Sequence, residues 1–146
     1  VLGSRGLGDV YKRQDKDVKV LVAPPLDDNV YQLVEAVLNH DKKRMFSCFR
    51  DLKLQSMQAS YLVSLLINKF QELYNVSVLI KGNTSQADIA NLFNVSSGRA
   101  YYMIKNAKAT NLSEIKKNLN LLNDLDYKIK TGRIDQNLGL ELYFLN

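Results

Sequence analysis

The chain has 146 residues, of which 46% are hydrophobic and 24% are charged, as in an ordinary globular domain. Its single cysteine excludes an internal disulfide, and its single histidine leaves little for a zinc site. The longest uncharged stretch, residues 54–68, is shorter than the ~20 apolar residues of a membrane-spanning helix. A formal charge of +5 indicates a nucleic-acid partner, provided that the basic residues belong to the folded protein.

Residues 4–14 (SRGLGDVYKRQ) resemble the translation of a transposon-type sequencing adapter over eleven consecutive positions. We therefore interpret residues 1–14 as an artefactual, disordered segment and exclude them from the fold. Gly3 and Gly8 have the spacing of a phosphate-binding P-loop, but Asp9 stands where the lysine of that motif belongs. Without three basic residues and one acidic residue of this segment, 17 basic and 14 acidic residues remain, a charge of +3. The remaining 132 residues are then a gene fragment without its natural start.

The next segment, residues 15–25, ends in two prolines, which break regular structure and indicate a linker. Taken alone, residues 18–22 (VKVLV) fit a β-strand. No proline occurs after Pro25 and glycine is sparse, so that residues 26–146 favour helices throughout.

Apolar residues recur at helical spacing in seven segments after the prolines. The predicted helices cover approximately residues 30–38, 42–52, 56–81, 86–93, 97–108, 112–130 and 138–145. Their predicted N-terminal caps are one of Asp27, Asp28 and Asn29, then Asp41, Ser56, Ser85, Asn111 and Asp135. Gly82 and Gly132 are predicted to end two of the helices. Without any hairpin signal, this pattern predicts an all-α helical bundle in which the long third helix is central.

Residues 86–103 have the spacing of a helix-turn-helix, with Asn94 in a left-handed turn. A DNA-reading second helix would present four side chains to the major groove, namely Ser97, Arg99, Tyr101 and Tyr102. Only one of the four is basic, whereas contacts to phosphates need several lysines or arginines. A structural helical corner is the favoured interpretation, and a DNA-binding regulator is the alternative.

No set of residues has the pattern of a catalytic site. Residues 130–132 (KTG) imitate a serine β-lactamase motif but end a predicted helix, whereas that motif lies on a strand. His40 and Cys48 have no third metal ligand near them in the sequence. We therefore predict no catalytic residue, no metal and no cofactor.

Three stretches resemble the bacterial DNA polymerase III delta subunit family. Residues 26–37 (LDDNVYQLVEAV) are similar to the junction that leads into its C-terminal domain, and residues 86–95 (QADIANLFNV) to a helical corner of that domain. Residues 126–135 (DYKIKTGRID) with residues 140–142 (LEL) are similar to its ending, which is the most specific of the three. The resemblance extends over about residues 15–146. It departs at the corner, where Asn94 replaces the usual glycine, but asparagine also tolerates a left-handed turn.

The resemblance implies a clamp-loader subunit. Residues 26–146 would be its helical collar domain, which joins the corresponding domains of the tau/gamma and delta-prime subunits in a pentamer. Residues 15–25 would be the linker and the end of a preceding lid-like domain. The resemblance implies that residues 18–22 end a helix, and we prefer this to the β-strand that their sequence alone fits. The N-terminal domains, missing here, would open the sliding clamp, and DNA would be contacted indirectly through the complex.

The family also implies a bacterial cytoplasmic protein that is no enzyme by itself but a subunit of the DNA polymerase III holoenzyme. In a collar, helix faces that the core does not use meet neighbouring subunits. Our candidates for this subunit interface are Tyr127, Arg133, Tyr143 and Phe144, in the last two predicted helices.

Overall fold

The computed structural model describes residues 26–146, and the predictions for residues 1–25 lie outside the described residues. Within this range the chain forms seven α-helices and no strand, which confirms the predicted all-α bundle. The helices are α2 (Leu26–Leu38), α3 (Lys42–Leu54), α4 (Ala59–Lys81), α5 (Gln86–Phe93), α6 (Ser97–Ala109), α7 (Leu112–Lys130) and α8 (Gln136–Leu145). None of these helices is both long and apolar enough to cross a membrane.

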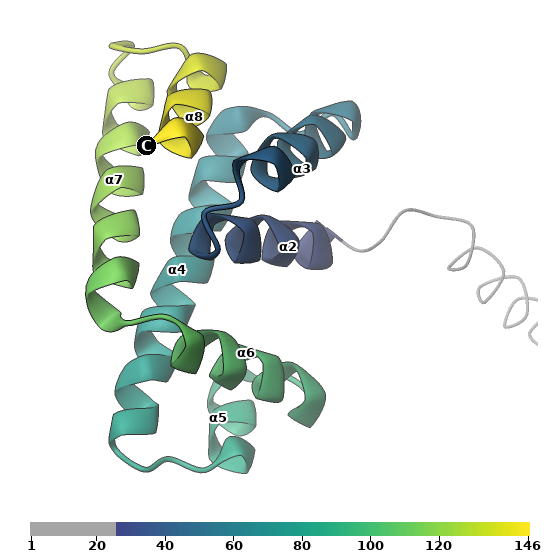
Figure 1. Cartoon of the computed structure of the whole chain (residues 1–146), viewed down its shortest axis with the longest axis vertical. Coiled ribbons are helices and arrows are strands. Elements are labelled where there is room, and N and C mark those ends of the chain that lie inside the picture. The colour runs from purple at the N-terminus through teal and green to yellow at the C-terminus, as the bar shows by residue number, and fades with distance from the viewer. Residues whose placement is uncertain (1–25) are drawn as a thin grey trace, which may run out of the picture.

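The 23-residue helix α4 is the axis of the bundle (Figure 1). It contacts α2, α6, α7 and α8, and α7 runs beside it over most of its length. Helices α3 and α8 lie at one end of the bundle, and α5 and α6 lie at the other. The apolar residues on several sides of α4 explain this position, because each covering helix needs an apolar surface to pack against. They include Leu62, Val63, Leu66, Phe70, Leu73 and Val76, all of them buried.

Most helix starts follow from capping residues that the sequence shows. Four predicted caps, Asp41, Ser85, Asn111 and Asp135, each accept the backbone N–H three residues later at 2.8–3.1 Å. Such a cap contributes about 1 kcal/mol by satisfying one of the unpaired N–H groups at a helix start. The prediction at Ser56 is wrong, since α4 begins at Ala59 and Ser56 belongs to the turn after α3.

Five helix ends share one turn, in which a residue with positive φ follows the helix. The N–H of the next residue then donates to the carbonyl five positions back, at 2.8–3.2 Å, which is a Schellman motif. The five residues, with φ of 56, 66, 61, 54 and 75°, are His40, Ser56, Asn83, Asn94 and Gly132. The predictions at Asn94 and Gly132 are confirmed. At the end of α4 the helix stops before Gly82, as predicted, but Asn83 takes the left-handed conformation.

Helix α8 closes the bundle through one aromatic side chain and one glycine. Phe144 is 1% exposed, and its ring lies edge-on to Phe46 and Phe49 of α3 at centroid distances of 5.7 and 5.6 Å. A Cβ at Gly139 would lie 2.5 Å from the Leu125 Cδ1 of α7, so the absence of a side chain lets α8 approach α7 closely. The two contacts fix α8 against α7 near its start and against α3 near its end.

The left-handed conformation of Gly132 can be tested by substitution. A Cβ at Gly132 would meet no atom within 4 Å, so Gly132→Ala changes only the cost of φ = 75°. We expect the free energy of unfolding, measured by urea denaturation, to fall by about 1 kcal/mol. The control Gly98→Ala also has open space but lies inside α6, where alanine should raise that free energy by about 0.5–1 kcal/mol. Equal effects of the two substitutions would contradict a left-handed conformation at Gly132.

Candidate functional site

The predicted DNA-reading helix is α6, and its start is fastened to α5. Ser96 caps α6 by accepting the Arg99 N–H at 3.1 Å. Gln86 Nε2 of α5 lies 3.0 Å from both the carbonyl oxygen and the Oγ of Ser97. The Ser97 side chain is therefore engaged in the corner between the two helices.

Arg99, the one basic residue of the candidate set, lies against α2. Its Cζ is 4.4 Å from the ring centroid of Tyr31, and Lys69 Nζ is 4.7 Å from the same centroid. The Tyr31 hydroxyl donates to Glu72 Oε1 at 3.4 Å, and Lys69 pairs with Glu72 at 3.7 Å. Burial, with the Glu72 carboxylate, raises the pKa of Tyr31, so the phenol stays protonated as a donor. Arg99 thus joins α6 to α2 and α4.

The remaining members of the set, Tyr101 and Tyr102, are 52% and 58% exposed and pack edge-to-face at 5.6 Å. Tyr102 borders a groove between α2 and α6, where cavities of about 210 and 270 Å³ share Glu35, Tyr102 and Asn106. Glu35 in this groove pairs with Arg44 at 3.3 Å. With Arg99 half-buried against Tyr31 of α2, the structure does not favour a helix-turn-helix reader of DNA.

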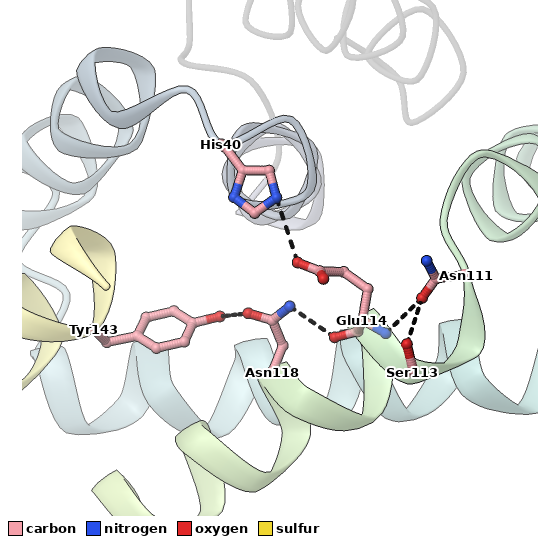
Figure 2. A network of polar contacts seen from close by, with 6 residues as sticks. All are labelled: His40, Asn111, Ser113, Glu114, Asn118 and Tyr143. Atoms are coloured by element: carbon pink, nitrogen blue, oxygen red, sulfur yellow. Dashed lines mark hydrogen bonds and ion pairs between the residues drawn. The ribbon is translucent and has the colours of Figure 1, made fainter.

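A second polar cluster joins α8, α7 and the turn between α2 and α3 (Figure 2). The hydroxyl of Tyr143 donates to Asn118 Oδ1 at 2.7 Å, and Asn118 Nδ2 donates to the Glu114 carbonyl at 2.9 Å. The Glu114 carboxylate lies 3.4 Å from His40 Nε2. Asn111, the cap of α7, accepts the Glu114 N–H and the Ser113 hydroxyl. Burial raises the pKa of Tyr143, which keeps its hydroxyl a donor.

These clusters have no catalytic geometry. His40 is paired with Glu114, and burial raises the pKa of the Cys48 thiol, which disfavours the nucleophilic thiolate. No group of three metal-ligating side chains occurs in residues 26–146. In this part of the chain the two polar clusters connect helices to one another.

The candidate subunit-interface residues divide into two pairs. Tyr127 is 54% exposed, and Arg133 stacks on its ring at 5.4 Å, so both are at the surface. Phe144 is in the core, and the hydroxyl of Tyr143 is bound to Asn118. Phe144, at 1% exposure, has almost no surface to offer a neighbour, and we correct the candidate set at this residue. Tyr143 is half-buried and stays a prediction. Tyr127 and Arg133 stay a prediction.

Two features of α7 and α8 were not predicted from the sequence. Asn118 is 6% exposed and connects α7 to α8, but an asparagine inside a helix gives no signal without knowledge of its partner. Leu138, Leu142 and Leu145 lie on the exposed face of α8, at 50, 50 and 54% exposure. Their signal is visible in the sequence, since α8 has more apolar residues than one buried side can hold.

The comparisons with known proteins agree with the fold. The family model described as "DNA polymerase III delta subunit, C-terminal domain" matches residues 27–146. The chain belongs to this family. The DNA polymerase III subunit delta of Bacillus subtilis (strain 168) is 27% identical over 139 residues, which are 95% of this chain and 40% of that protein.

A solved structure gives the same result. The Bacillus subtilis DNA clamp loader delta protein is similar to this chain with a TM-score of 0.79 and 28% identity, over 89% of this chain and 38% of that one. The predicted family resemblance is confirmed, and the chain spans about 40% of the length of the curated relative.

The Tyr143–Asn118 hydrogen bond can be tested by Tyr143→Phe. Because Asn118 is buried, loss of the hydroxyl leaves its Oδ1 without that donor, and we expect the free energy of unfolding to fall by about 1–2 kcal/mol in urea denaturation. Tyr127→Phe is the matched control, since Tyr127 is 54% exposed, and should have little effect. Equal stability of the two variants would contradict the proposed linkage of α7 and α8.

The raised pKa values of Tyr31 and Tyr143 predict a dependence of stability on alkaline pH. In the unfolded chain both phenols lose their protons near pH 10, whereas the folded chain retains them, so unfolding releases protons. Stability from these two groups is therefore complete below about pH 10 and falls as pH rises above it. In an alkaline pH titration, tyrosinate absorbance should show a phase above pH 10, and this phase should be smaller in Tyr143→Phe. A titration in which all tyrosines lose their protons near pH 10 would contradict the prediction.

Proposed function

We propose that residues 26–146 act as the collar domain of a bacterial clamp-loader delta subunit, which assembles with the corresponding domains of tau/gamma and delta-prime subunits. The family match over residues 27–146 carries this proposal. The likeness to the Bacillus subtilis DNA clamp loader delta protein, at a TM-score of 0.79, supports it.

The proposed role is mechanical and not catalytic. The polar clusters of residues 26–146 hold helices together and bring no nucleophile and base into contact. The chain matches 40% of the curated relative. We assign clamp opening to the part of the subunit that lies outside this match. The whole subunit would contact DNA through the complex and serve the DNA polymerase III holoenzyme in the bacterial cytoplasm.

Tyr127 and Arg133 are proposed contacts with a neighbouring subunit. They lie at the C-terminal end of α7 and in the turn that follows it, with the guanidinium 5.4 Å from the ring centroid. Tyrosine and arginine are enriched in interfaces because each combines a large apolar surface with hydrogen-bonding groups. An exposed pair that is already stacked loses little conformational freedom on binding.

Association with clamp-loader subunits tests the proposal. The chain should co-elute in gel filtration with the tau/gamma and delta-prime subunits of its own organism, and should hydrolyse no ATP on its own. The control is the intact delta subunit of that organism under the same conditions. Failure of the chain to associate where intact delta binds would refute the proposal.

A further inference from the structure

Three leucines form a stripe on the outer face of α8. Leu138, Leu142 and Leu145 are separated by four and three residues, so they lie along one side of the helix. Each keeps about half of its surface exposed, at 50, 50 and 54%. Isolated exposed leucines are ordinary, but three in a row on one helix are an apolar seam.

The opposite side of α8 is equally apolar. Leu140 and Phe144 are buried in the core at 0 and 1% exposure. A helix with apolar residues on two opposite sides is typical of a position covered on both, yet only one of these sides of α8 is covered within residues 26–146. The stripe is therefore a surface for which the domain supplies no cover.

Helix α3 lies beside α8 (Figure 1), and basic residues occur along one side of it. Phe46 marks the side of α3 that meets α8, because its ring lies edge-on to Phe144. Residues three, four and seven positions from Phe46 share its side of the helix. Among them are the buried Phe49 and four exposed basic residues, Lys42, Lys43, Arg50 and Lys53.

The two helices present one joint surface. Lys42 Nζ donates to the carbonyl of Leu145 at 3.2 Å and so connects the start of α3 to the end of α8. No carboxylate of residues 26–146 forms an ion pair with Lys43, Arg50 or Lys53. Helix α3 carries five basic residues and one acidic residue, and Glu141 is the acidic residue of α8. The apolar seam is thus flanked by an excess of positive charge.

We propose that the α8–α3 face, which comprises the stripe Leu138, Leu142 and Leu145 and the basic residues of α3, binds an acidic amphipathic helix of a neighbouring clamp-loader subunit. The inference rests on the proposed function and specifies its surface. Spacings of four and three residues are those of the seam between two packed helices, which argues for a helical partner. Carboxylates beside that partner's apolar seam would face the α3 cations. Nucleic acid would use the cations but leave the leucines uncovered.

The first experiment removes the apolar seam. Leu142→Gln with Leu145→Gln, in the chain that co-elutes with its clamp-loader partners, should weaken their association by at least about tenfold, as loss of a central interface contact does. The matched control is Leu92→Gln, which changes a 65% exposed leucine on α5 and should leave association unchanged. Unchanged association of the double variant would overturn the inference.

The second experiment reverses the charge and does not touch the leucines. Lys43→Glu with Arg50→Glu changes two exposed side chains, so the fold should persist even if the leucine variant is unstable. Association should weaken and lose part of its dependence on salt, whereas Lys105→Glu with Lys108→Glu on α6 should have no effect.

The remaining outcomes separate the two proposals. If the unmodified chain does not associate at all, the proposed function fails, and this inference fails with it. If the chain associates and both α8–α3 variants bind as tightly as the unmodified chain, only this inference fails. Loss of binding to a short DNA duplex in Lys43→Glu with Arg50→Glu, with subunit association unchanged, would assign the face to nucleic acid and overturn it. If the α8–α3 variants lose only the self-association of the chain, the face binds a second copy of this chain, and the inference is overturned.

Discussion

The fold depends on one constraint, the burial of α4 on several sides at once. A 23-residue helix with buried residues around much of its circumference cannot be covered by one partner, and α2, α6, α7 and α8 divide this task. Burial of each large apolar side chain contributes about 1.5–3 kcal/mol, so the positions of the covering helices are set by α4. The outer surface of the domain is formed by the faces of these four helices that do not pack on α4.

The polar clusters secure the covering helices on this axis. Tyr31, with Arg99 and Glu72, joins α2 to α6 and α4, and Tyr143 with Asn118 joins α8 to α7. Both tyrosines place a protonated hydroxyl where burial disfavours a charge. Such contacts fix which helix lies against which, because a buried donor has few alternative acceptors. In residues 26–146 the tyrosines, asparagines and charged groups at these positions therefore serve the assembly of the bundle.

The packing of the helices decides which residues of α6 and α8 are exposed. The α6 helix looks like a DNA reader in sequence, but its single arginine completes a contact with α2. Helix α8 looks like a helix with aromatic interface residues, but its aromatic side is turned inward and its leucine side outward. On α6, Tyr101 and Tyr102 stay exposed and only the arginine is engaged within the domain, whereas on α8 the exposed side is the leucine side and Phe144 is buried.

Capping residues, helical spacing and the absence of proline after Pro25 determined the seven helices and the all-α class, because these signals act within a few residues along the chain. The local pattern also located the left-handed turns at Asn94 and Gly132. It did not locate those at His40 and Ser56, because histidine and serine are not typical of this conformation, or that at Asn83, because the adjacent Gly82 was predicted to end the helix. Only the tertiary structure decided which side of α8 is buried. Leu138, Leu140, Leu142 and Phe144 are similarly apolar, and the choice among them follows from Gly139 packing on Leu125 and from Phe144 reaching α3.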